Sequence, residues 1–111
     1  MADVSIKRHD DKVEFADTLK VNGVPVDLTD CTVSFLLKKT GLAIKQAAVI
    51  VYPTEQADPD KRGKVKYHVT PDDVAVKGKY RQEWEVVFTD DEILTFPNDD
   101  YNNVEILEDL G

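Results

Sequence analysis

Apolar and polar residues alternate along most of the chain, a pattern typical of β-strands that bury one face. The alternation is strongest at residues 31–38 and 80–88. The residues expected to point inward are Cys31, Val33, Phe35 and Leu37 in the first segment and Tyr80, Gln82, Trp84, Val86 and Phe88 in the second. These two segments are therefore predicted to be central strands.

Shorter alternating or β-branched runs predict further strands at 4–8, 13–21, 24–28, 47–52, 64–69, 93–96 and 104–108. Turn-forming residues separate them, notably Asn22-Gly23, Lys39-Thr40-Gly41 and the polar loop 53–63. The segment 93–96 is expected to return as the hairpin partner of 80–88. Thr70-Pro71-Asp72-Asp73 has the residues of a helix start, so one short helical crossover is predicted near 71–76.

This pattern favours an all-β fold, a single antiparallel β-sandwich of about seven or eight strands, immunoglobulin-like or related. The length of 111 residues suits one domain spanning 1–111, with an acidic C-terminal strand and tail from about residue 98. A single cysteine, Cys31, excludes an internal disulfide and is expected to be a small buried apolar residue rather than a reactive thiol.

The formal charge of −8 is unevenly distributed. Residues 89–111 contain eight of the 22 acids and no Lys or Arg, so the first 88 residues hold 14 acids and 14 bases. This distribution disfavours nucleic-acid binding. The acidic end is expected to be a solvated surface, and the alternative is a surface that docks on a basic partner. The candidates for such docking are Asp99, Asp100, Glu105, Glu108 and Asp109.

Candidate chemistry is sparse. The only serines are Ser5 and Ser34, and no phosphate-binding glycine loop or metalloprotease motif occurs. We therefore predict no catalytic residue, no cofactor and no enzymatic activity. Among the acid pairs, the most plausible metal site is the turn that gathers Asp90, Asp91 and Glu92, joined by Asp99 or Asp100. A solvated hairpin tip is the favoured interpretation of this cluster, so no metal is predicted.

Exposed aromatic residues could bind sugars by stacking, and the candidates are Tyr67, Trp84 and Tyr101. Trp84 shares its predicted strand face with Val86 and Phe88. Burial of Trp84 in the core is therefore favoured over a sugar-binding platform.

Ordered motifs along the chain resemble the N-terminal module of bacteriophage baseplate upper proteins, and with it β-sandwich domains of siphophage tail accessory proteins. The motifs are PVDLT at 25–29, TVSFLLK at 32–38, GKVKY at 63–67, GKYRQEWEVVF at 78–88 and TFP at 95–97. The chain departs from the family pattern in the hairpin after Phe88. There it has Asp90-Asp91-Glu92 where the family commonly has Asp-Gly.

The resemblance implies a non-enzymatic structural or accessory protein of a phage tail or baseplate that binds another virion protein. The implied location is the virion tail, with synthesis and assembly in the host cytoplasm. A host-surface carbohydrate-binding module is the alternative function. Neither nucleic acid nor membrane is expected as a partner, and a homo-oligomer stays open. Strands 4–8 and 104–107 are the edges expected to pair with another chain.

Overall fold

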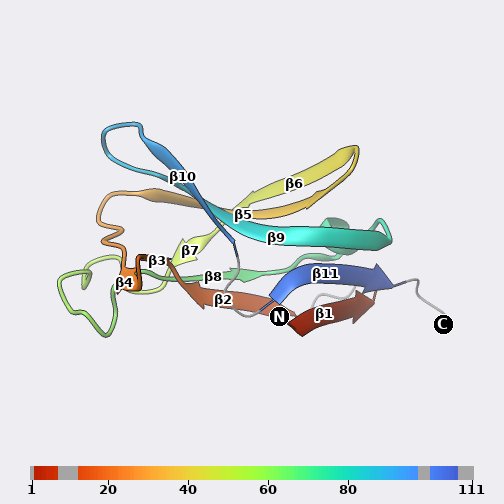
Figure 1. The fold of residues 1–111 in the computed structure, drawn as a ribbon, viewed down its shortest axis with the longest axis horizontal. Coiled ribbons are helices and arrows are strands. Elements are labelled where there is room, and N and C mark those ends of the chain that lie inside the picture. The colour runs from red at the N-terminus through yellow and green to blue at the C-terminus, as the bar shows by residue number, and fades with distance from the viewer. Residues whose placement is uncertain (1, 8–12, 98–100, 108–111) are drawn as a thin grey trace.

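The computed structural model describes residues 2–7, 13–97 and 101–107, which form eleven strands and one short 3₁₀ helix (Figure 1). The strands are β1 (Ala2–Lys7), β2 (Glu14–Thr18), β3 (Lys20–Val21), β4 (Val24–Pro25), β5 (Thr32–Lys39), β6 (Leu42–Ala47), β7 (Val49–Ile50), β8 (Lys64–His68), β9 (Gly78–Val87), β10 (Ile93–Pro97) and β11 (Tyr101–Leu107). The helix η1 (Pro71–Val74) lies between β8 and β9.

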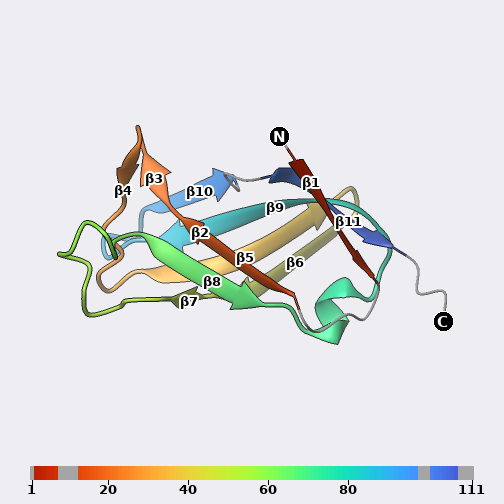
Figure 2. The ribbon, with the colours of Figure 1, turned by 90° about the horizontal axis from the view of Figure 1, so that it is seen from below.

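These strands form three sheets. The largest has the order β1-β11-β9-β5-β6, and β10 also pairs with β9. A second sheet has the order β2-β8-β7, and β3 pairs with β4 in a short ribbon. Viewed from below, β2 and β8 cross β5 and β9, so the two larger sheets form two layers (Figure 2). All strand pairs are antiparallel except β1 with β11, which is parallel.

The core lies between these layers and is centred on Phe35 and Trp84, which are opposite each other in the β5–β9 pair. The Phe35 ring packs edge-on against Trp84 at 5.6 Å between centroids, and it contacts Phe15 of β2 at 5.0 Å. Tyr67 of β8 stacks on the same ring at 4.4 Å. Since Trp84, Phe35 and Phe15 are almost fully buried, aromatic contacts bring together strands of both sheets.

Hydrogen bonds to Asp73, a buried carboxylate in η1, stabilise the crossover from β8 to β9. One oxygen accepts hydrogen bonds from the Tyr67 hydroxyl and from the backbone N–H of Thr70 (2.9 Å). The other accepts from the side-chain amide of Gln46 on β6 (3.2 Å). These neutral donors satisfy a carboxylate that would otherwise be costly to bury.

The polar loop between β7 and β8 is organised around the buried side chain of Gln56. Its Oε1 accepts from the backbone N–H of Leu28 (3.0 Å) and of Gly63 (3.1 Å), and its Nε2 donates to the carbonyl of Tyr52 (2.8 Å). Gly63 has φ +79°, and a Cβ there would lie 2.8 Å from the carbonyl oxygen of Leu19. The loop is thus held to the fold by a glutamine and a glycine.

The predicted all-β class is confirmed, as are the strands at 31–38 and 80–88 and the hairpin return at 93–96. The crossover is also present, as a 3₁₀ turn over 71–74. A single sandwich of seven or eight strands is not confirmed: eleven strands form, of which β3, β4 and β7 have two residues each. The expectation of purely antiparallel pairing is wrong, because β1 pairs with β11 in parallel. The immunoglobulin-like relation and the single domain over 1–111 stay predictions.

The strand predicted at 47–52 is present only as the short β7 (Val49–Ile50), and the strand before it, β6, was not predicted. The two-residue turn Thr40-Gly41, with Gly41 at φ +80°, returns the chain at once into β6 as the hairpin partner of β5. Residues 49–50 then form β7, which pairs with β8 in the second sheet. The expectation that 104–107 forms an edge fails as well, because β11 lies between β1 and β9.

Candidate functional site

The acid cluster predicted at 90–92 forms the exposed turn of the β9–β10 hairpin. The Phe88 N–H donates to the Glu92 carbonyl (2.8 Å), and the Asp91 N–H donates to the Phe88 carbonyl (3.0 Å). The Asp90 carboxylate accepts from the Glu92 N–H (3.0 Å), and Asp91 adopts φ +67°. Each acid therefore has a local role in shaping the turn, where Asp is among the residues that tolerate such geometry.

In the part of the chain that the structure describes, no group of three His, Cys, Asp or Glu side chains could hold a metal ion. Asp99, the fourth metal candidate, lies outside the described residues. Of the docking candidates, Glu105 lies on β11 opposite Lys79 of β9 and is partly exposed. Asp100, Glu108 and Asp109 also lie outside the described residues.

Cys31 lies beside the acidic hairpin turn, just before β5. Partial burial raises the pKa of its thiol, and the charges of Asp27, Asp30 and Asp90 raise it further. The thiol lies 3.6 Å from the carbonyl oxygen of Thr29. A raised pKa keeps this cysteine protonated at neutral pH, which agrees with the expectation of an inert thiol.

The sugar-stacking candidates have different surroundings. Trp84 is fully buried, so the favoured expectation of a core residue is confirmed and the alternative of a surface stacking residue is wrong. Its burial results from its position on the inner face of β9, between β5 and β10. One face of Tyr67 stacks on Phe35 and its hydroxyl is bound to Asp73. Tyr101 begins β11, and its side chain is outside the described structure.

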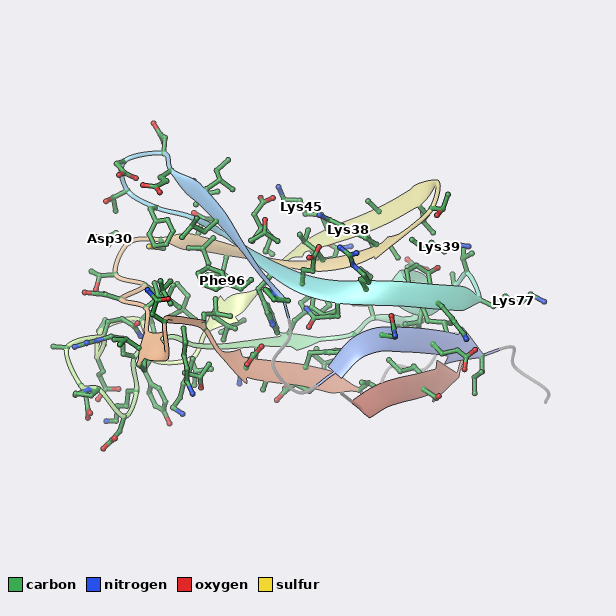
Figure 3. All side chains as sticks on the ribbon, in the orientation of Figure 1. Asp30, Lys38, Lys39, Lys45, Lys77 and Phe96 are labelled. Carbon is green, nitrogen blue, oxygen red and sulfur yellow. The ribbon has the colours of Figure 1, made fainter. Side chains whose placement is uncertain are left out.

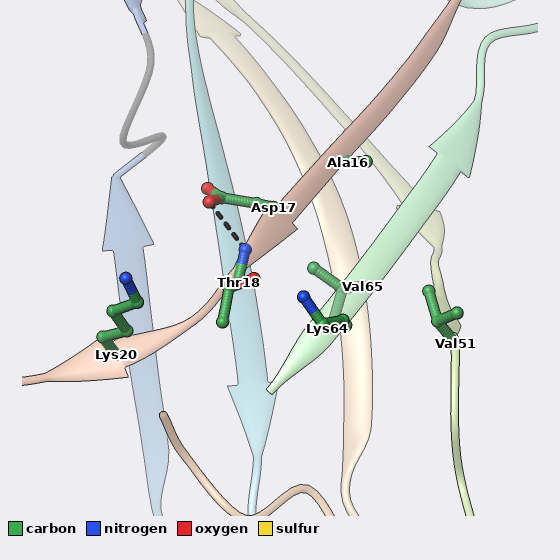
Figure 4. Close-up of a pocket in the computed structure, with 7 residues that line it drawn as sticks. All are labelled: Ala16, Asp17, Thr18, Lys20, Val51, Lys64 and Val65. Atoms are coloured by element: carbon green, nitrogen blue, oxygen red, sulfur yellow. Dashed lines mark hydrogen bonds between the residues drawn. The ribbon is translucent and has the colours of Figure 1, made fainter. Parts of the chain in front are cut away.

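A hollow of about 420 Å³ lies where β2 and β8 meet (Figure 4). Its lining consists of Ala16, Asp17, Thr18, Lys20, Val51, Lys64 and Val65. The Thr18 N–H donates to the Asp17 carboxylate at 2.8 Å, so this acid accepts a hydrogen bond from the last residue of its own strand. The lining contains no aromatic side chain on which a sugar could stack.

A basic hollow of about 310 Å³ was missed from the sequence. It is lined by Lys38, Lys39, Thr40, Lys79, Tyr80, Arg81 and Asn103. Figure 3 places Lys39 and Lys77 at one end of the molecule and Asp30 at the other. The bases come from two strands, β5 and β9, and acids balance them over the first 88 residues, so the net charge gave no sign of their clustering. Glu83 pairs with Lys38 (3.3 Å) and lies 3.9 Å from Arg81.

A third hollow, of about 300 Å³, lies beside the acidic turn and is lined by Phe88, Thr89, Asp90, Glu92 and Leu94. Next to it, Ile93 is 57% exposed and Leu94 is 38% exposed. Contiguous exposed apolar side chains are a feature of surfaces that contact other proteins, and Ile93 and Leu94 are neighbours beside this partly apolar hollow. The geometry thus offers a protein-contact surface at the hairpin.

These features define an all-β domain whose surface suits contact with other proteins. In the described ranges, no helix is long and apolar enough to cross a membrane. The model of the BppU N-terminal domain family matches residues 3–98, and the chain therefore belongs to this family, the N-terminal module of phage baseplate upper proteins. This confirms the resemblance drawn from the sequence motifs. No curated protein matches the chain.

Membership in this family makes the chain a structural protein of the phage baseplate, located in the virion tail. It is a family of structural domains, which agrees with a non-enzymatic role.

Proposed function

We propose that the chain is a non-enzymatic baseplate component whose task is to bind another virion protein. The observation that carries the proposal is the family match across residues 3–98, which covers most of the chain. The exposed apolar residues at the hairpin support it, because a surface of this kind is stabilised by a protein partner. Synthesis in the host cytoplasm, followed by assembly into the tail, is part of the same proposal.

Carbohydrate binding has less support. A stacking platform needs an open aromatic face, and of the three candidates Trp84 is buried and Tyr67 is covered on one face by Phe35. Nucleic acid is also disfavoured as a partner by the charge of −8. A homo-oligomer is compatible with the proposal, since copies could contact each other as well as a different protein.

The test is to label intact, purified phage particles with an antibody raised against the folded chain. We expect label at the tail end distal to the head and a constant number of copies per particle by quantitative immunoblotting. Labelling of infected-cell lysate with none on particles contradicts the proposal. Binding of purified host wall polysaccharide to the chain, with no label on particles, favours the carbohydrate alternative instead.

A further inference from the structure

The hairpin strand β10 is an edge strand: in the described ranges it pairs with β9 and with no other strand. The Phe88 N–H to Glu92 carbonyl bond fixes which residues face β9. Because backbone groups of an antiparallel strand alternate in direction, Leu94 and Phe96 bond toward β9, and the N–H and C=O groups of Ile93 and Thr95 point outward. The outward N–H and C=O groups of Ile93 and Thr95 are therefore positioned to form hydrogen bonds with an added strand.

The composition of β10 distinguishes it from the other edges. β1, β2 and β6 are edge strands of five or more residues, and each carries at least one charged residue, such as Asp17 in β2 and Lys45 in β6. Charged residues on an edge discourage pairing with another chain. The sequence of β10, ILTFP, contains no charge. Among the edge strands of this length in the described structure, it is the one without that protection.

Both faces of β10 offer apolar contacts to an added strand. Leu94 is opposite Val86 and shares its inner face with Phe96, and Ile93 lies on the other face opposite Val87. The hollow lined by Phe88 and Leu94 is rimmed by Asp90 and Glu92. A lysine or arginine suits this hollow, because its aliphatic stem can lie on the apolar floor while its charge reaches the carboxylates.

We propose that β10 adds a strand from another virion protein, an extended apolar segment with a Lys or Arg positioned against Asp90 and Glu92. This inference rests on the proposed function and specifies its contact. The outward backbone groups of Ile93 and Thr95 supply the hydrogen bonds, and the alternating side chains supply the specificity.

A second copy of this chain fits the edge poorly because of its charges. In the sequence, β10 is preceded by Asp90-Asp91-Glu92 and followed closely by Asp99-Asp100. Residues 89–111 contain no Lys or Arg, so a second copy would bring only negative charge to this edge. Parallel pairing would align identical acids. Like charges directly opposite each other destabilise strand pairs, so a partner with positive charge is favoured.

The first test places a photoreactive residue at position 93 of the full chain in assembled phage particles, and at Ala43 as the matched control. Ala43 is an exposed position of the edge strand β6. We expect position 93 to give one cross-linked product with a different virion protein. Mass spectrometry should map the cross-link to an extended segment containing Lys or Arg. Position 43 should not give this product.

The second test compares Thr95→Pro with Ala43→Pro. Proline at position 95 removes an outward backbone N–H without breaking a hydrogen bond to β9. Ala43 is the equivalent position in β6, because the backbone groups of β6 alternate from the Thr40-Gly41 turn and those of Ala43 point away from β5. We expect Thr95→Pro to lower incorporation into particles roughly tenfold or more, given the loss of an interface hydrogen bond and strand contact. Ala43→Pro should be incorporated normally. Unchanged fluorescence of the buried Trp84 verifies folding of both variants.

Glu92→Gln provides a variant that keeps all backbone groups. It should weaken incorporation by a smaller factor than Thr95→Pro. Particles that contain the chain but give no cross-link from position 93, or a cross-link only to a second copy, overturn the strand-addition proposal and leave the virion role intact. Absence of the unmodified chain from particles contradicts the proposed function itself.

Discussion

The two ends of the β9–β10 hairpin differ sharply in environment, although the same two strands form both. At one end Trp84 and Phe96 are opposite each other, with Trp84 fully buried and Phe96 8% exposed. At the other end Val87 is opposite Ile93, which is 57% exposed. The first pair lies in the core, where Trp84 packs against Phe35 and Phe96 lines a hollow together with Thr18 of β2. The second pair lies next to the acidic turn. Strand pairing alone therefore does not set burial; the opposing layer does.

Replacing a side chain at each end measures this difference. We expect Trp84→Ala to lower the free energy of unfolding by roughly 3–5 kcal/mol, because it leaves a large cavity beside Phe35. Ile93→Ala should cost about 0.5 kcal/mol or less, as is usual for surface positions. Guanidinium unfolding followed by circular dichroism measures both values. Similar losses at the two positions would contradict the assignment of the core.

The core end should also depend on alkaline pH. Burial, with a further contribution from Asp73, raises the pKa of Tyr67 well above its ordinary value. Because the folded state holds this proton more tightly than the unfolded chain does, the resulting stability is complete below about pH 10 and is lost as pH rises above that value. The free energy of unfolding should fall above pH 10, and Tyr67→Phe should reduce the slope. Burial raises the pKa of Tyr80 as well, so some slope should remain.

A small stabilisation is expected from a substitution in the turn. Asp91 has φ +67°, a conformation that glycine adopts without strain. Asp91→Gly should raise the free energy of unfolding by about 0.5–1 kcal/mol, because glycine adopts this left-handed backbone conformation without strain. The Asp91 side chain is exposed, so its removal costs little packing. Asp60→Gly, at an exposed position without positive φ, should lower stability. If both substitutions change stability equally, the turn geometry at Asp91 is not the cause.

Alternation was sufficient to predict the central strands, because β5 and β9 are buried on one face along most of their length. Phe35 and Trp84 follow from this pattern directly. It did not predict β6, whose outer positions are exposed and whose apolar residues Leu42 and Ile44 are only partly buried. The parallel partnership of β1 with β11 has no local signal in sequence, because the two strands are about a hundred residues apart.

The contact surface was predicted only in part. The acid cluster at 90–92 is evident in the sequence, and its place at a hairpin tip followed from the expected return at 93–96. The open edge of β10 was not foreseen, since edges are defined by which strands lie next to each other in space. The sequence had predicted an edge strand at 104–107, but in the structure this segment lies between β9 and β1.

The pairing of β1 with β11 also bears on how the protein forms during synthesis. Residues 2–7 emerge from the ribosome about a hundred residues before their partner strand, residues 101–107. β1 therefore has no partner strand until residues 101–107 have been translated. Closing so long a loop carries a large entropic cost, and contacts of this range slow folding. Completion of the large sheet is thus a late step in folding, and a nascent chain stalled before β11 would leave β1 available to a chaperone.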